Sequence, residues 1–185
     1  MTVDGSDHVH VVWCDGTPGN YEIYYKKSTD AGATWSQNQR LTWTPMASSS
    51  PDIKADAFGN LHVVWQEDTP GSIEIYYRKS TDGGATWGPS RRLTWNTDAS
   101  ISPALHVESS GNIHLVWSDY TPGNVEVFYR MSSDRGVTWT TPKRLTWNAG
   151  DSWSPQLIVQ WGYNYHLVWS DSTPGNYEIY YRRQD

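Results

Sequence analysis

Short segments in which apolar and polar residues alternate recur along the whole chain, and clusters of Gly, Pro, Asn and Ser separate them. Alternation of this kind, rich in β-branched and aromatic side chains, is typical of β-strands. No segment carries apolar residues at a helical period over a sufficient length. In the third of the repeating units described next, the pattern predicts four strands, at residues 104–108, 113–117, 125–130 and 139–146.

The chain consists of about four copies of one unit. The sequence Trp-x-x-x-Thr-Pro-Gly begins at four positions, each 52 residues after the one before: Trp13, Trp65, Trp117 and Trp169. The sequence Arg-Leu-Thr-Trp recurs with the same spacing at Arg40, Arg92 and Arg144. Such regularity indicates a repeat architecture in which neighbouring units bury each other's apolar faces.

Four short antiparallel strands per unit describe one blade of a β-propeller. A single four-stranded sheet leaves an apolar face uncovered, whereas sheets arranged around an axis cover one another. We therefore predict an all-β protein, a β-propeller of four-stranded antiparallel blades that forms a single domain over residues 1–185. The blades are predicted at about residues 1–50, 51–102, 103–154 and 155–185, and the last is incomplete.

A third motif, Ser-x-Asp-x-Gly-x-Thr-Trp, occupies the turn before the predicted fourth strand. It resembles the Asp-box (bacterial neuraminidase) repeat, and the resemblance implies a sialidase-like propeller with the box between the third and fourth strands of a blade. The Asp can accept hydrogen bonds from turn amides, the Gly permits a positive φ, and the Trp can fold back onto the blade. Because the motif recurs, we predict a structural role for its residues: Ser28, Asp30, Gly32, Trp35, Ser80, Asp82, Gly84, Trp87, Ser132, Asp134, Gly136 and Trp139.

Composition narrows the classes of partner. The chain has 12 Trp and 12 Tyr but only 2 Phe, a balance that suits half-buried strands and sugar-binding surfaces. Its formal net charge is -6 and it has no run of Lys or Arg, which argues against nucleic acid and anionic membranes as partners. No apolar stretch approaches the ~18 residues of a membrane-spanning helix.

The first ten residues carry neither the basic nor the apolar segment of a signal peptide. The location of the protein is therefore left open, and it is extracellular or periplasmic if the chain is cut from a secreted parent. Cys14 is the single cysteine, so it has no partner for an internal disulfide or a zinc site. No cofactor is predicted.

The resemblance to sialidases also implies where catalysis would come from. Enzymes of that family hold the substrate carboxylate with an arginine triad, whose first member lies in an Arg-Ile-Pro motif, and they use a Tyr–Glu pair and an acid/base Asp. This chain has no Arg-Ile-Pro, and most of its arginines occupy equivalent positions of different repeats. We therefore predict a non-catalytic propeller that binds glycans or serves as an interaction scaffold. The alternative is a sialidase-like glycoside hydrolase, or a fragment of one.

The links from the fourth strand of one blade to the first strand of the next form the predicted ligand-binding face. Each link places an indole near amide, carboxylate and hydroxyl groups. An aromatic face can cover the apolar face of a sugar ring while polar groups bind its hydroxyls. The predicted ligand-binding residues are Trp43, Trp95, Asn96, Trp147, Asn148, Asp151 and Trp153. The competing interpretation is that each Trp packs between blades.

Three further sets of equivalent residues have structural interpretations. Four histidines are expected to be packed and hydrogen-bonded, without a shared metal, because they belong to different blades: His10, His62, His114 and His166. The acids that follow the Trp of the second strand are expected to stabilise turns: Asp15, Glu67, Asp119 and Asp171. The acids that begin the third strand are expected to pair with the arginine of Arg-Leu-Thr: Glu22, Glu74, Glu126 and Glu178.

The predicted partners are a glycan and a second copy of the chain. The last blade is expected to expose its third strand, residues 177–183, as an open edge. A second copy would complete a larger ring or pair with this edge. The alternative is a four-bladed monomer.

Overall fold

The computed structural model describes residues 1–17, 19–160 and 164–184, and all the regular elements in these ranges are β-strands. The first sheet contains β1 (Thr2–Val3), β2 (Val9–Asp15), β3 (Glu22–Ser28) and β4 (Gln39–Arg40). The second contains β5 (Ser48–Ala55), β6 (Leu61–Thr69), β7 (Ser72–Ser80) and β8 (Arg91–Arg92). The third contains β9 (Ser100–Val107), β10 (Ile113–Asp119), β11 (Glu126–Ser132) and β12 (Lys143–Arg144). The fourth contains β13 (Ser152–Gln160), β14 (Asn164–Asp171) and β15 (Glu178–Gln184).

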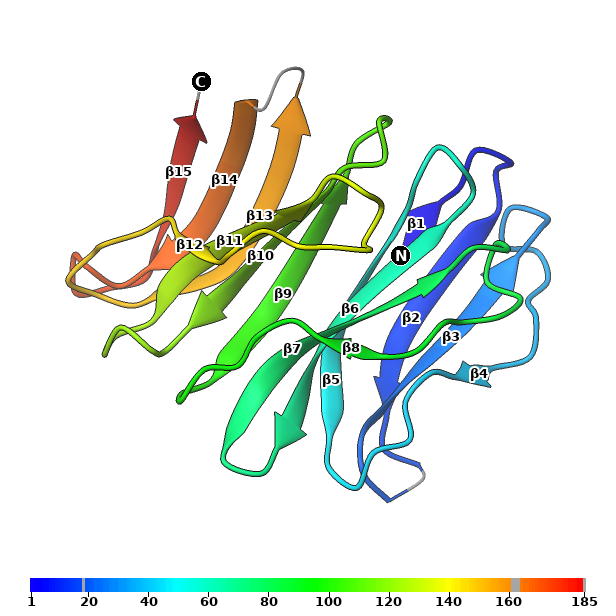
Figure 1. Cartoon of the computed structure of the whole chain (residues 1–185), viewed down its shortest axis with the longest axis horizontal. Coiled ribbons are helices and arrows are strands. Elements are labelled where there is room, and N and C mark those ends of the chain that lie inside the picture. The colour runs from blue at the N-terminus through cyan, green and yellow to red at the C-terminus, as the bar shows by residue number, and fades with distance from the viewer. Residues whose placement is uncertain (18, 161–163, 185) are drawn as a thin grey trace.

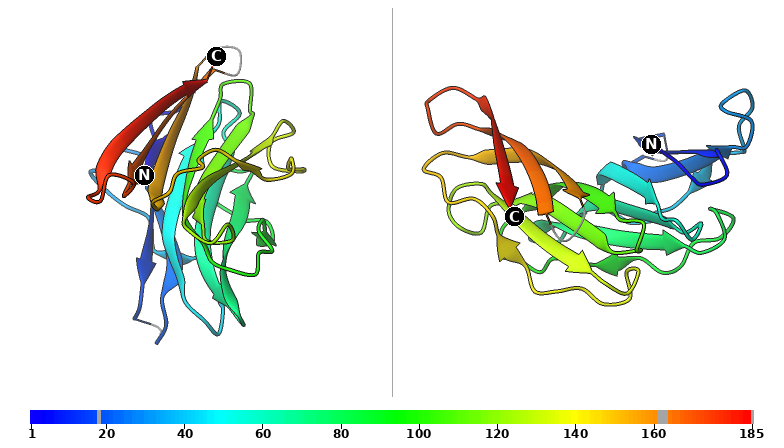
Figure 2. Two further views of the ribbon diagram at one scale, coloured as in Figure 1. Left: turned by 90° about the vertical axis from the view of Figure 1, so that its left-hand side faces the viewer. Right: turned by 90° about the horizontal axis from the view of Figure 1, so that it is seen from above.

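Every sheet is antiparallel, and its strands follow the order of the chain. The four sheets succeed one another along an arc whose first and last members lie at opposite ends (Figures 1 and 2). The first strands of successive sheets contact each other, β5 with β9 and β9 with β13. In the part of the chain that the structure describes, these four sheets do not close into a ring. Among the described residues there is no helix long and apolar enough to cross a membrane.

Neighbouring sheets pack through the same positions of the repeat each time. Between the second and third sheets, one side of the core consists of Val64, Ile75, Tyr77 and Leu93, which we call the forward face of a sheet. The other side, the rear face of the next sheet, consists of Leu105, Ile113, Leu115 and Trp117. The first and second sheets repeat this arrangement with Ile23, Tyr25 and Leu41 against Ile53, Leu61, Val63 and Trp65. The sheets therefore stabilise one another pairwise, as the repeat pattern predicts.

The fourth strand is shorter than the sequence predicts. A strand was expected over residues 139–146, but ladder pairing is confined to Lys143–Arg144. After Arg144 the Thr146 hydroxyl, instead of a backbone carbonyl, accepts the Val127 amide at 2.8 Å. Before Lys143, Pro142 has no amide hydrogen to donate to the ladder. The equivalent threonines, Thr42 and Thr94, accept the Ile23 and Ile75 amides in the same way.

The Asp box is a compact turn closed by its own side chains. Asp82 accepts the Thr86 amide at 2.9 Å and the Thr86 hydroxyl, and Ser80 Oγ accepts the Gly84 amide at 2.8 Å. The hydrogen bonds from Thr86, then that from Ser80, lower the pKa of Asp82 to about 2. The other two boxes have the same bonds at Asp30 and Asp134. The box thus also joins sheets, because Trp87 meets Tyr25 of the preceding sheet edge to face, with ring centroids 5.2 Å apart.

Candidate functional site

The loops of each sheet gather at two opposite ends. Asn20, in the turn between β2 and β3, donates from Nδ2 to the Thr44 carbonyl at 2.9 Å and the Met46 carbonyl at 2.6 Å. That turn and the link to the next sheet therefore lie together, at what we call the link end. We call the opposite end the box end. There the Cζ of Arg135, a residue of the third Asp box, lies 3.7 Å from the ring centroid of Phe58, which is in the turn between β5 and β6.

Three indoles are exposed at the link end, at one position of the repeat. Trp43, Trp95 and Trp147 are 66%, 67% and 63% exposed. These fractions are nearly equal, and the sequence left open whether these residues would pack between sheets. The structure presents each ring to solvent, where a flat partner can reach it.

An anchored guanidinium accompanies each of these indoles. The Arg92 Cζ lies 5.9 Å from the ring centroid of Trp95, within cation–π distance. Arg92 donates from Nε to the Thr94 carbonyl at 2.6 Å and from Nη2 to the buried Glu74 at 2.6 Å. The same arrangement recurs at Arg40 with Trp43 and at Arg144 with Trp147, each 5.8 Å from its ring. The expected pairing of Glu22, Glu74 and Glu126 with these arginines is confirmed.

The polar residues predicted beside the indoles are engaged within the protein. Asn96 Nδ2 donates to Ser100 Oγ at 2.9 Å and to the carboxylate of Asp119. Asn148 makes the equivalent bonds to Ser152 and Asp171. Asp151 accepts the Val125 amide at 2.9 Å. The two asparagines hold their links onto the next sheet, and Asp151 holds its link to the sheet before it.

Trp153, a predicted ligand-binding residue, stands where the other repeats have Ser49 and Ile101. Its surroundings differ from those of the three exposed indoles. Its ring is partly buried and meets Tyr120 edge to face, with centroids 5.5 Å apart. Its indole nitrogen is buried and has no hydrogen-bond partner among the described residues. Trp153 therefore packs against the protein on at least one side.

The acids that follow the second-strand Trp bind that Trp. Glu67, Asp119 and Asp171 accept the indole N–H of Trp65, Trp117 and Trp169 at 2.9, 2.8 and 2.9 Å. Burial raises the pKa of Glu67, against hydrogen bonds from Trp65 and Ser48 that lower it. In Asp171 burial also opposes ionisation, but hydrogen bonds from Thr173 and Trp169 prevail and lower its pKa to about 2. Asp15, Asp119 and Asp171 have the turn role expected for them, because they accept the amides of Thr17, Thr121 and Thr173. Glu67 instead accepts bonds from Trp65 and Ser48.

The four equivalent histidines lie in separate sheets, and each is hydrogen-bonded to a tyrosine of its own sheet. His10, His62, His114 and His166 place Nδ1 2.7–2.9 Å from the hydroxyls of Tyr25, Tyr77, Tyr129 and Tyr181. On the other ring nitrogen the partner is an acid in the first three sheets and Gln160 in the fourth. This is the packed, hydrogen-bonded role that the sequence predicts.

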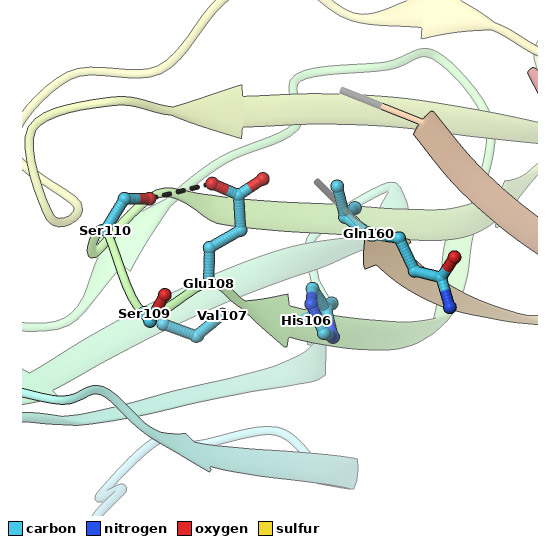
Figure 3. Close-up of a pocket in the computed structure, with 7 residues that line it drawn as sticks. His106, Val107, Glu108, Ser109, Ser110 and Gln160 are labelled. Carbon is cyan, nitrogen blue, oxygen red and sulfur yellow. Dashed lines mark hydrogen bonds between the residues drawn. The ribbon is translucent and has the colours of Figure 1, made fainter. Parts of the chain in front are cut away.

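A cavity of about 490 Å³ lies at the box end, between the ends of β9 and β13. Its lining includes His106, Glu108, Ser110 and Gln160 (Figure 3). The Glu108 carboxylate accepts the Ser110 hydroxyl at 2.7 Å and also bonds Asn112 and His114. The cavity is therefore at the opposite end of the sheets from the exposed indoles.

Comparison with solved structures identifies the fold. No protein-family profile and no curated protein matches the chain. A Hadza microbial sialidase superposes with a TM-score of 0.71 at 13% identity, over 99% of this chain and 43% of the sialidase. The α-L-arabinofuranosidase Arb93A from Fusarium graminearum gives 0.77 at 16% identity, over 98% and 60%. The intramolecular trans-sialidase from Ruminococcus gnavus gives 0.56 at 20% identity, over 90% and 41%.

The chain is thus a β-propeller assembly of the kind found in sialidases and arabinofuranosidases, and it spans roughly half the length of these relatives in structure. The prediction of an all-β, sialidase-like propeller with four-stranded antiparallel sheets is confirmed at this level.

Proposed function

We propose that this protein is a non-catalytic glycan-binding propeller whose repeated sites are centred on Trp43, Trp95 and Trp147. The observation that carries the proposal is the nearly equal exposure of these indoles, 66%, 67% and 63%, at one position of three sheets. A core indole would be covered by a neighbouring sheet, as Trp65 and Trp117 are by the sheet before their own. An exposed ring on a rigid sheet end is a platform for the apolar face of a sugar.

Each platform also has a polar donor held in place. Arg92 donates from Nε to the Thr94 carbonyl and from Nη2 to Glu74, so the guanidinium keeps a fixed orientation. Neither of these bonds uses Nη1, from which the guanidinium can donate to a sugar oxygen. Equivalent sites on one rigid body favour multivalent ligands, because the second contact is made at high effective concentration. Each site would therefore bind sugar weakly by itself, and the three sites together would bind a glycan chain or a glycan-covered surface.

The charged residues at the link end support a non-catalytic role. Glu22, Glu74 and Glu126 are fully buried and paired with Arg40, Arg92 and Arg144. A second set of arginines donates to leucine carbonyls of the preceding sheet: Arg78, Arg130 and Arg182. Both sets are used identically in successive repeats, whereas a catalytic centre needs a group that differs from its equivalents.

A glycoside hydrolase, or a part of one, is the second candidate function. It is favoured by the solved structures that the chain resembles, a sialidase and an arabinofuranosidase among them. Glu67, whose pKa burial raises, is the acid at the link end that best fits a proton donor.

Replacing all three platform indoles, Trp43→Ala, Trp95→Ala and Trp147→Ala, is expected to lower the avidity for a multivalent glycan by at least about 100-fold. The ligand is first found on a glycan array, and binding is then measured by surface-bound titration. Phe58→Ala is the matched control, since Phe58 is an exposed aromatic residue, 52% exposed, at the box end. Unchanged binding by the triple variant would overturn the proposal, and release of sugar from an aryl sialoside or aryl arabinofuranoside would favour the hydrolase.

We further propose that a second copy of the chain binds head to tail. The forward face of the fourth sheet of one copy would pack on the rear face of the first sheet of the other copy. The fourth sheet exposes its forward-face residues: Val168 is 39% exposed, Ile179 78% and Tyr181 59%. The residues equivalent to Ile179, which are Ile23, Ile75 and Val127, are all fully buried. In the three internal contacts a forward face packs on the rear face of the next sheet, and this supports a rear face as the partner of the fourth sheet.

The rear face of the first sheet is the matching surface. Val9, Val11 and Trp13 are only partly buried, while their equivalents in the second sheet, Leu61, Val63 and Trp65, are fully buried. The Asp box offers a further match, because Gly84 and Gly136 lie against Tyr25 and Tyr77 of the preceding sheet. At Gly32 a methyl group would meet nothing closer than Trp35 at 3.9 Å, which leaves room for Tyr181 of another copy.

Light scattering on a sizing column is expected to give the wild-type chain a mass above the 21.1 kDa of one copy, rising with concentration. Ile179→Glu is expected to return it to one copy, since a buried unpaired charge opposes association. Val137→Glu is the control, at a residue 63% exposed in the third Asp box. A wild-type mass of 21.1 kDa at high concentration, or an Ile179→Glu mass equal to wild type, would contradict the association.

A further inference from the structure

The loop between β1 and β2 brings one carboxylate and two imidazoles together at the box end of the first sheet. Asp4 Oδ2 lies 3.1 Å from His8 Nδ1 and 3.1 Å from His10 Nε2, and the three atoms all lie within 4.8 Å of one another. Ligand atoms around a tetrahedral Zn²⁺, with bonds of about 2.0–2.2 Å, lie about 3.3 Å apart. We propose that Asp4, His8 and His10 bind a divalent transition-metal ion, Zn²⁺ or its analogues Co²⁺ and Ni²⁺.

Two of the three ligand side chains, those of Asp4 and His10, are oriented by further hydrogen bonds. The other oxygen of Asp4, Oδ1, accepts the Ser6 amide at 2.8 Å and the His8 amide at 3.0 Å, which directs Oδ2 towards the histidines. His10 is fully buried and its Nδ1 lies 2.8 Å from the Tyr25 hydroxyl. A hydrogen bond on the far nitrogen fixes the tautomer and orientation of a ligating imidazole, as in metal sites generally.

The charge of the cluster and its access to solvent also suit a metal ion. A bound ion would take the place of the hydrogen atoms that His8 Nδ1 and His10 Nε2 share with Asp4 Oδ2, because a ligating imidazole offers the lone pair of its nitrogen. Asp4 supplies the negative charge of the cluster, and its Oδ2 lies 3.1 Å from a nitrogen of each histidine. The His8 side chain is 32% exposed, which leaves an open side where water can complete the coordination.

The other repeats supply an internal comparison. In the second sheet Asp56 and His62 keep the acid and imidazole, 3.2 Å apart, but Asn60 stands at the position of His8. Asn60 Nδ2 donates to Asp56 Oδ2 at 2.6 Å, so this position reaches the carboxylate in both repeats. An amide nitrogen is not a metal ligand. Asn112 and Asn164 occupy the position in the remaining repeats, so within the described residues only the first sheet has three ligands.

Titration with Co²⁺, followed by its visible absorption and by calorimetry, tests the site. The wild-type chain is expected to bind one equivalent with the spectrum of a nitrogen- and oxygen-ligated ion, and His8→Asn is expected to weaken binding at least tenfold. His8→Asn is a conservative change, because it recreates the arrangement of the second sheet and keeps a donor to the carboxylate. Its unfolding midpoint in metal-free buffer is expected to match wild type.

Asn60→His provides the reciprocal test, since it adds the missing ligand beside Asp56 and His62. We expect it to raise the stoichiometry from one to two equivalents per chain, provided that its metal-free unfolding midpoint shows an intact fold. If Asn60→His does not fold, His8→Asn alone decides. Wild-type binding that His8→Asn leaves unchanged, or the absence of binding at millimolar Co²⁺, would overturn the proposal and leave His8 as a hydrogen-bond donor that replaces asparagine.

Discussion

Gly84→Ala is expected to lower the free energy of unfolding by about 2 kcal/mol more than Gly32→Ala, because the new methyl group would overlap a neighbouring ring. Both glycines have a positive φ, 87° and 93°, so the backbone strain of an alanine is the same at the two sites. A methyl group on Gly84 would overlap the Tyr25 hydroxyl, whereas on Gly32 it would meet only Trp35 at 3.9 Å. The difference between the two variants therefore isolates the contact between sheets.

Tyr25 cannot move aside without breaking other contacts. Its hydroxyl lies 2.8 Å from His10 Nδ1, and its ring meets Trp87 with centroids 5.2 Å apart. Urea unfolding of both variants measures the effect, best in an Ile179→Glu background so that no second copy covers Gly32. Gly136→Ala is expected to behave like Gly84→Ala, because Gly136 lies against Tyr77 in the same way. Equal losses at Gly32 and Gly84 would show that the packing of Tyr25 tolerates the methyl group.

The sequence contains most of the information about the fold because each element occurs several times. The 52-residue spacing of Trp13, Trp65 and Trp117 identifies the repeat, and the Thr-Pro-Gly turns mark where the second strand ends. The predicted fourth strand is too long. The same alternating pattern occurs where the backbone pairs with the third strand and where a threonine side chain accepts the hydrogen bond in place of the backbone. No local pattern distinguishes a threonine that points outward from Thr146, which accepts a backbone amide.

The site was less accessible from the sequence than the fold. The links were predicted to present indoles beside free polar groups, and the structure exposes Trp43, Trp95 and Trp147. However, Asn96 donates to Asp119, a residue 23 positions away in the next sheet, and such a partner depends on how sheets pack. That these residues bind a ligand stays a prediction.

The cluster of Asp4, His8 and His10 was missed although a signal for it exists. His8 stands where the other repeats have Asn60, Asn112 and Asn164, and this departure from the repeat is visible in the alignment of the copies. The histidines that are equivalent in all four copies are instead those of the second strand, His10, His62, His114 and His166. A residue that breaks the repeat is therefore more informative about function than one that obeys it, since the repeat itself expresses what every sheet needs to fold.

The protein is expected to lose stability as the pH falls from about 7 towards 4, and His62 is expected to be a main cause. Burial lowers the pKa of His62 from 6.5 to about 4 in the folded chain, against a hydrogen bond from Asp56 that raises it. Between these two values the unfolded chain binds a proton that the folded chain does not, so stability rises with pH across this window and falls on acidification. The pKa of Asp56 is also lowered, because hydrogen bonds from Asn60 and His62 outweigh the burial that would raise it. The stability that the ionised Asp56 contributes is therefore lost at pH values below the range in which His62 acts.

His62→Gln separates this residue from the other buried histidines, because glutamine can still bond Tyr77 and does not titrate in this range. One proton taken up only by the unfolded chain changes the free energy of unfolding by about 1.4 kcal/mol per pH unit. Urea unfolding between pH 6 and pH 4.5 is therefore expected to give a slope against pH that is smaller in His62→Gln than in wild type by up to about that amount. His10 and His114, whose pKa values burial also lowers, would retain their share of the slope in the variant. Parallel slopes for the two proteins would mean that His62 accepts a proton in the folded state, and that its contact with Asp56 outweighs its burial.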